Sequence, residues 1–200
     1  MTKSPQFIII IIEVMFMLSD FYGIYQKTRN AAWQFLIDYN IQELPLDLNP
    51  IIEKIGVQIK YGDERLLKPN QRGLTAISGT ETYIVVRKKS STAETRYTIA
   101  HELGHSYLGH LLTDSGYIQT DASEYQAERF AIDILAPACV LWGLNLHTAN
   151  EISQVCNISI SAAKIRAERM EILYRRNKFL THPLERQVYK QFLNFINKNK

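Results

Sequence analysis

The stretch His101-Glu-Leu-Gly-His105 decides how this chain of 200 residues is interpreted. Two histidines four residues apart on a helix lie only about 40° apart around its axis, so both side chains can face one metal ion. Glu102 lies about 100° from His101, where its carboxylate can hold a water that the metal activates instead of binding the metal itself. The pattern therefore predicts a zinc peptidase helix, provided that another part of the chain supplies a third ligand.

A second predicted helix, at residues 121–135, carries a candidate for that third ligand. Its apolar side chains form a stripe, and Glu124 and Glu128 stand in line with this stripe near the start of the helix. Two carboxylates on an inward face are costly without a cation or a hydrogen-bond donor. We therefore expect Glu124 to supply an oxygen ligand beside the nitrogens of His101 and His105.

These residues predict one zinc ion per chain, because a catalytic zinc keeps three protein ligands and one open position. We expect Glu102 to act as the general base that takes a proton from the attacking water and passes it to the leaving amine. Glu128 either accepts the free ring N–H of a ligand histidine or is a solvated charge on the helix. His110 follows His105 by five residues, so it should point away from the metal and cap the end of the helix.

Periodicity and turn residues predict mixed α and β structure around this site. Helices are expected at 19–39, where Ser19 or Asp20 can form the cap, and at 49–55, 92–108 and 121–135. Strands are expected at 57–61, 74–78 and 83–87, of which the last two form a hairpin. Two or three further helices follow Pro137, with starts at Thr148, at Ser159 or Ser161, and after Pro183.

The N-terminal segment is apolar and of uncertain status. Glu13 interrupts the run at 7–18, which is too short and too charged for a confident membrane span. The preferred interpretation is that translation starts at Met15 or Met17, and the alternatives are a membrane anchor or a buried extra element. The chain is therefore divided into this segment (1–18), a metallopeptidase core (19–137) and a helical extension (138–200).

Composition narrows the class of protein. The apolar fraction of 46% and the charged fraction of 22% are typical of a soluble globular protein. A net charge of only +3 gives no global reason for a nucleic-acid partner. Cys139 and Cys156 form no CxxC pair, which favours free buried thiols in a reducing cytoplasm over a disulfide.

Three stretches carry a resemblance to a known family. Arg96-Tyr-Thr-Ile-Ala-His-Glu-Leu-Gly-His105, Glu124-Tyr-Gln-Ala-Glu-Arg-Phe-Ala131 and Ile-Leu-Ala-Pro137 resemble the ImmA/IrrE metallopeptidases. These are similar to gluzincins, whose third ligand is a Glu on the next helix. The resemblance implies an α+β, zincin-like core with a small sheet and an HExxH helix, followed by a helical extension with a helix-turn-helix-like stretch. Family members often have Asn or Asp where Glu128 stands, which leaves the geometry around the ligands open.

The resemblance also implies a function. It indicates a bacterial or phage zinc metalloendopeptidase that cleaves a helix-turn-helix repressor encoded nearby and so relieves repression of a mobile element or a stress regulon. One alternative is a regulator that keeps the fold and the metal without cutting. The other is a DNA-binding regulator that uses the basic helix at 161–178, although its apolar residues fit core packing equally well.

The remaining site candidates are weaker. His147 and His182 lie in predicted turns, and Tyr117 and Tyr125 have no pattern that ties them to the metal. The substrate is expected to lie extended along the strand at 83–87, because strand addition gives main-chain hydrogen bonds that do not depend on sequence. On this hypothesis a proline at the centre of that strand, in place of Val85, should cripple cleavage.

Overall fold

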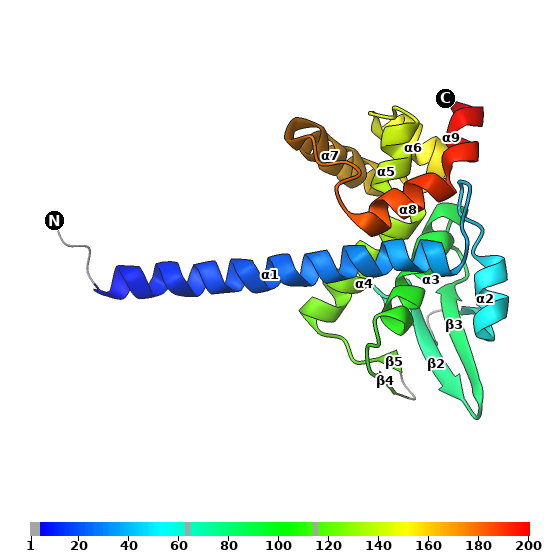
Figure 1. The fold of residues 1–200 in the computed structure, drawn as a ribbon. Helices are drawn as coiled ribbons and strands as arrows, with labels where there is room; N and C mark the ends of the chain where they lie inside the picture. The colour runs from blue at the N-terminus through cyan, green and yellow to red at the C-terminus, as the bar shows by residue number, and fades with distance from the viewer. Residues whose placement is uncertain (1–4, 63–64, 114–115) are drawn as a thin grey trace.

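The computed structural model describes the backbone of residues 5–62, 65–113 and 116–200, and the side chains from Tyr22 onward within these ranges. A small sheet lies against helices and the C-terminal region is helical, which confirms the predicted α+β class (Figure 1). The helices are α1 (Pro5–Asp38), α2 (Asn49–Ile55), α3 (Thr92–Tyr107), α4 (Asp121–Leu135), α5 (Ala138–Gly143), α6 (Ala149–Cys156), α7 (Ile160–Arg176), α8 (Pro183–Gln191) and α9 (Leu193–Asn199). The strands are β1 (Val57–Gly62), β2 (Gly73–Ser78), β3 (Glu81–Arg87), β4 (Leu112–Thr113) and β5 (Gly116–Tyr117).

The main sheet has the strand order β1-β3-β2. Strand β3 pairs in parallel with β1, with Val57 opposite Thr82, and antiparallel with β2, with Gly73 opposite Val86. Because both of its edges are paired, β3 offers no free backbone to a peptide. The expectation that a substrate adds to the strand at 83–87 is therefore wrong, and β2 is the strand of this hairpin that lies at the edge of the sheet.

Helix α3 begins and ends where local chemistry predicts. The Ser91 side chain accepts a hydrogen bond from the Glu94 backbone N–H, and the Glu94 side chain accepts one from the Ser91 N–H, which is the capping box expected from the sequence. At the other end Gly109 takes a left-handed φ of 72°, so the chain leaves the helix there. The helix therefore presents His101 and His105 at fixed positions on one rigid element.

Helices α3 and α4 pack closely at Gly104. A Cβ atom at this position would lie 3.1 Å from Cδ1 of Phe130 and 3.2 Å from the backbone oxygen of Ala127. Because glycine has no side chain, the backbones of α3 and α4 can approach each other closely at this position. This approach lets the start of α4, which a second capping box at Thr120 fixes, face the histidines of α3.

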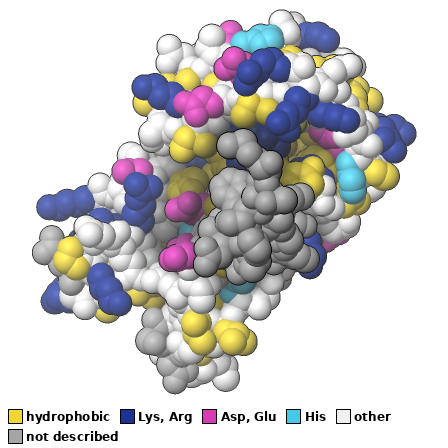
Figure 2. All heavy atoms as spheres, turned by 90° about the vertical axis from the view of Figure 1, so that its left-hand side faces the viewer, with side chains coloured by type: hydrophobic (Ala, Val, Ile, Leu, Met, Phe, Trp, Pro, Cys, Tyr) yellow, Lys and Arg dark blue, Asp and Glu magenta, His cyan; other side chains and the backbone are white. Residues whose placement is uncertain are grey.

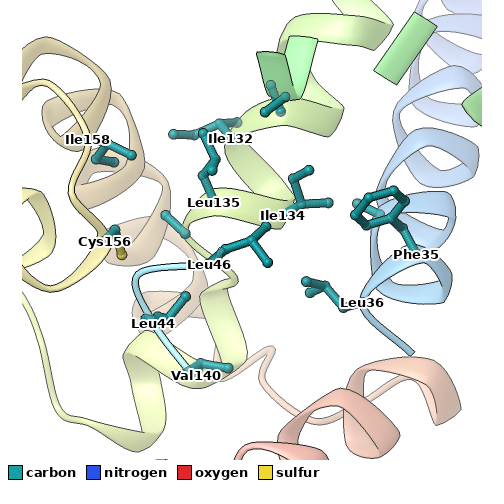
Figure 3. Close-up of a cluster of buried hydrophobic side chains, with 14 of the residues drawn as sticks. Phe35, Leu36, Leu44, Leu46, Ile132, Ile134, Leu135, Val140, Cys156 and Ile158 are labelled. Carbon is teal, nitrogen blue, oxygen red and sulfur yellow. The ribbon is translucent and has the colours of Figure 1, made fainter. Parts of the chain in front are cut away.

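The hydrophobic core surrounds α4. Figure 3 shows Phe35 and Leu36 of α1 facing one side of α4 at Ile134, with Cys156 and Ile158 on its other side. These side chains belong to one cluster of buried apolar residues that also includes the sheet. Contact on both sides explains why most residues in the second half of α4 are buried.

The C-terminal helices join this same core. Arg166 of α7 is 2% exposed, and its Nη2 donates to Asp133 of α4 at 2.5 Å and to the Ile132 carbonyl at 2.9 Å. The predicted helix starts at Thr148, Ser159 and Pro183 are confirmed, whereas the short helices α5 and α9 are not among the predicted elements. The two cysteines are buried free thiols, as predicted.

Helix α1 is longer than the sequence indicates. It begins at Pro5 and continues through Ser19 and Asp20, so the predicted cap at these residues is wrong (Figure 1). Residues 1–4 and the side chains of the rest of segment 1–18 lie outside the described part of the chain, so the alternatives for that segment stay predictions. Within the part that the structure describes, no helix combines the length and apolarity needed to cross a bilayer.

Candidate metal centre

The three predicted ligands lie together. His101 and His105 come from α3 and Glu124 from the first turn of α4, and one ligand atom from each lies within 4.8 Å of the others. The two histidine Nε2 atoms are 3.0 Å apart. Glu124 places Oε2 3.3 Å from Nε2 of His101 and Oε1 3.3 Å from Nε2 of His105. The nitrogens and carboxylate oxygens thus converge on one point.

The charge states of these groups fit a cation at that point. Burial lowers the pKa of His101 to about 4 and that of His105 to about 3, so both rings are neutral at pH 7 and their contacts with Glu124 are not ion pairs. Burial also raises the pKa of Glu124, and its buried Oε1 has no hydrogen-bond partner among the described residues. Two neutral imidazoles and a carboxylate oxygen are a donor set of catalytic zinc sites.

Glu102 is buried beside this cluster. Its side chain is 7% exposed, and the Thr75 hydroxyl of β2 donates a hydrogen bond to its Oε2 at 2.7 Å. Burial raises the pKa of Glu102 to about 7, although the Thr75 hydroxyl partly opposes this. A carboxyl group with this pKa can both take up and release a proton near neutral pH, as a general base must.

A cavity of about 320 Å³ opens onto Glu102 and His105. Thr75 forms part of its wall from β2, and Tyr117 forms another part from the β4–β5 hairpin. The Tyr117 ring stacks on the His105 imidazole, with 4.9 Å between centroids and 14° between planes. Tyr117, for which no sequence pattern indicates a role, therefore lies at the site.

His110 lies beside His105 but outside the cluster of ligand atoms, as the sequence predicts. Its Nδ1 lies 2.8 Å from Nδ1 of His105, and its Nε2 lies 3.1 Å from Oε1 of Gln126. The left-handed turn at Gly109 folds the chain back, so the helical spacing of five residues does not apply. The His110 backbone N–H also donates to the His105 carbonyl, which does match the predicted role at the helix end.

Glu128 is exposed on α4, which agrees with the alternative of a solvated helix charge. Among the described residues it makes no hydrogen bond to His101 or His105, and the Nδ1 partner of His105 is His110. Glu128 instead lines a second cavity of about 310 Å³ together with Tyr125. A hydrogen bond from a ligand histidine to Glu128 stays a prediction.

The other candidate histidines lie elsewhere. His147 contacts Oδ1 of Asn145 and stacks on Tyr174, while His182 caps α8 and stacks on Trp33. Neither histidine lines the cavity beside the metal centre. The geometry therefore gives no support to either as a group that stabilises an oxyanion.

The fold and the site together define a class of protein. A small sheet, a helix that carries two histidines and a carboxylate from the next helix form an arrangement that metallopeptidases use. The family described as the IrrE N-terminal-like domain matches residues 53–168, from α2 to α7, and the chain belongs to this peptidase family. Among curated proteins, no match to the sequence is found.

Proposed function

We propose that the protein is a zinc-dependent endopeptidase. The observation that carries this proposal is the convergence of His101, His105 and Glu124 beside the protonatable carboxyl of Glu102. The donor set suits zinc, and the adjoining cavity leaves room for a peptide bond. Membership of a metallopeptidase family supports the same assignment.

The residues of the site have separate roles in the proposed reaction. When bound, zinc would polarise the scissile carbonyl and make a water acidic enough to lose a proton near neutral pH. The Thr75 hydroxyl donates to Oε2 of Glu102 and so orients the carboxylate that takes the proton of the attacking water. Glu102 then returns that proton to the amine nitrogen that leaves. The rings of Tyr117 and His110 both pack on His105 and hold its imidazole in place.

We further propose that the substrate lies along β2. In an antiparallel ladder every second pair of opposite residues exchanges backbone hydrogen bonds. Arg72 and Arg87 form such a pair, because the Arg87 N–H donates to the Arg72 carbonyl at 3.0 Å. Thr75 and Ile77 stand at the alternate positions, so their backbone groups face away from β3. The Thr75 backbone interacts with the Glu102 carboxylate, and its carbonyl lies against Gly116 of β5, so Ile77 is the residue proposed to pair with the substrate. A peptide paired with this edge would run past Glu102, which Thr75 already contacts.

A pair of proline substitutions tests this arrangement. Ile77→Pro should keep the sheet, because its N–H faces away from β3, but should reduce cleavage strongly. Val85→Pro places the ring in the central strand and should unfold the protein instead. Circular dichroism and zinc content separate the two effects, and full activity of folded Ile77→Pro would exclude pairing at that residue.

The family resemblance suggests the target, a helix-turn-helix repressor in the cytoplasm. Two buried cysteines without a disulfide agree with a reducing compartment. The test is co-expression with the repressor encoded nearest to the gene, followed by mass spectrometry of the fragments. Cleavage by the wild type and its absence with Glu102→Gln would support the proposal, with an expected rate loss of at least about 10²–10⁴-fold.

Two results would point to other conclusions. If zinc binds and the repressor is retained without being cut, the protein is a non-proteolytic regulator. If Glu124→Ala holds zinc as tightly as the wild type while Glu128→Ala loses it, the assignment of the third ligand is wrong. The two glutamates lie one turn apart on α4, so each variant is a matched control for the other.

A further inference from the structure

A strongly basic cavity lies between α1, α4, α5, α7 and α8. Its volume is about 690 Å³, and its wall contains none of the residues assigned to the metal centre. Six cationic side chains and two carboxylates line it, namely Arg29, Arg129, Arg166, Arg169, Arg176 and Lys178 against Asp133 and Glu185. Figure 2 shows Lys and Arg side chains gathered on the upper part of the face from which α1 projects.

Tyr25 stands among three of these arginines. Arg129 and Arg169 both donate from Nη2 to the Tyr25 hydroxyl, at 3.3 Å and 2.7 Å. Their guanidinium carbons lie 4.9 Å and 5.1 Å from the centroid of the Tyr25 ring, and that of Arg29 lies at 5.8 Å. A phenol accepts these hydrogen bonds and attracts cations weakly, but it does not neutralise three like charges.

The protein supplies too little negative charge for this cluster. Within the described residues, Asp133 is the one acid at ion-pair distance, and it is shared between Arg129 at 3.4 Å and Arg166 at 2.5 Å. Arg29 and Arg169 have no such partner there, and the buried Nε atoms of these two arginines and of Arg166 lack a hydrogen-bond acceptor. Like charges gathered in a partly enclosed space repel strongly unless an anion joins them.

We propose that this cavity binds a small phosphate-bearing anion with two or more negative charges. Guanidinium groups match phosphate oxygens in geometry and charge, and the cavity volume is that of a small-ligand site. The walls come from five helices and the loop before α8, so the site is a recess and not the open basic surface that a nucleic-acid duplex needs. The inference stands independently of the peptidase assignment.

Isothermal titration of the full-length protein at physiological salt tests this site. The probes are inorganic pyrophosphate, ATP and inorganic phosphate, and we expect one molecule of pyrophosphate or ATP to bind per chain. Similar affinities for pyrophosphate and ATP would assign recognition to the phosphates alone, whereas a clear preference for ATP would assign a nucleotide.

Matched variants on α7 locate the binding. Arg169→Gln should weaken it by about tenfold or more, which is the usual effect of losing a hydrogen bond between charged groups. Arg175→Gln removes the same charge from an exposed position outside the cavity and should leave the affinity unchanged. Arg29→Gln serves as a second cavity variant if circular dichroism shows that Arg169→Gln is misfolded.

Three outcomes would overturn the proposal. The first is that none of the probes binds to the wild type at millimolar concentration. The second is equal weakening by the cavity variant and by Arg175→Gln, which would mean attraction to the overall charge. The third is salt-dependent binding of duplex DNA that is lost in Arg169→Gln, without binding of the small anions.

Discussion

Replacing Glu102 with Gln should change how the stability of the metal-free protein depends on pH. The pKa of the buried carboxyl is about 7, against 4.5 for an ordinary glutamate. Below pH 4.5 the group is protonated in both the folded and the unfolded chain. Between pH 4.5 and pH 7 mainly the unfolded chain loses the proton, so stability falls as the pH rises. The gap between the two pKa values corresponds to about 3 kcal/mol at pH 8.

The glutamine side chain of the variant has no proton to lose, and its amide oxygen can still accept the Thr75 hydroxyl. Glu102→Gln should therefore match the wild type near pH 4.5 and exceed its free energy of unfolding by about 3 kcal/mol at pH 8. The buried histidines behave in the opposite way. The lowered pKa values of His101 and His105 give stability above pH 6.5 that is lost as the pH falls, but this loss is common to both proteins and cancels in the difference.

Urea unfolding with a metal chelator present, at several pH values from 4.5 to 8, measures this difference. Glu168→Gln is the control, because it removes an exposed carboxylate from α7 and should shift the free energy of unfolding little at any pH. A difference between wild type and Glu102→Gln that stays flat across the range would refute the reasoning. So would a difference that grows toward acid pH.

Three other substitutions probe the packing and the chemistry of the site. Gly104→Ala should lower the free energy of unfolding by about 1–3 kcal/mol in urea titrations, because the added methyl group presses on the α4 backbone. His110→Leu should weaken zinc binding by about 10–100-fold in competition with a chelator, and an unchanged affinity would mean that His105 needs no partner at Nδ1. Thr75→Val removes a hydroxyl that lowers the pKa of Glu102, so the acidic limb of the pH–rate profile should move to higher pH. A limb that does not move would show that another group titrates there.

The elements that carry the site are predictable from local signals. The bounds of α3 follow from the capping box at Ser91 and the glycine at position 109, and those of α4 from Thr120 and Pro137. Both signals act within one turn of the helix end, so they need no knowledge of the rest of the fold. The meeting of His101 and His105 with Glu124 is also expected, because inward carboxylates without a partner are rare.

The strand order is not among the predictions, although a signal for it is present. Ile84, Val85 and Val86 form an unbroken buried run in β3, which is typical of a strand covered on both sides. In β2 only Thr75 is buried, and the residues on both sides of it are partly or fully exposed. Strand β1 could pair with either strand of the hairpin, and long-range packing decides that it pairs with β3. The position of a strand in the sequence relative to the motif helix does not predict this choice.

Two further arguments extend a local helix rule beyond the backbone that supports it, although the predicted role of His110 at the helix end holds. The prediction for His110 assumes a helix that has already ended, because Gly109 turns the chain by a left-handed conformation. The prediction of a cap at Ser19 or Asp20 fails because a polar pair begins a helix only if the backbone before it is not helical, and α1 is already helical from Pro5. In both cases the residue types suit the predicted role, but the backbone conformation that the prediction assumes differs from the observed one.

The buried pair between Arg166 and Asp133 also limits how this chain can be divided or recombined. Asp133 belongs to the same helix as Glu124, so a fragment that stopped at Pro137 would leave the Asp133 carboxylate with Arg129 alone and without its shorter contact to Arg166. Breaking a buried ion pair costs up to about 3–5 kcal/mol when the remaining charge has no other partner, and Arg129 would offset part of that loss here. The C-terminal helices are therefore not an interchangeable module, and a swap with another protein would succeed only if the incoming segment brought its own arginine to that position.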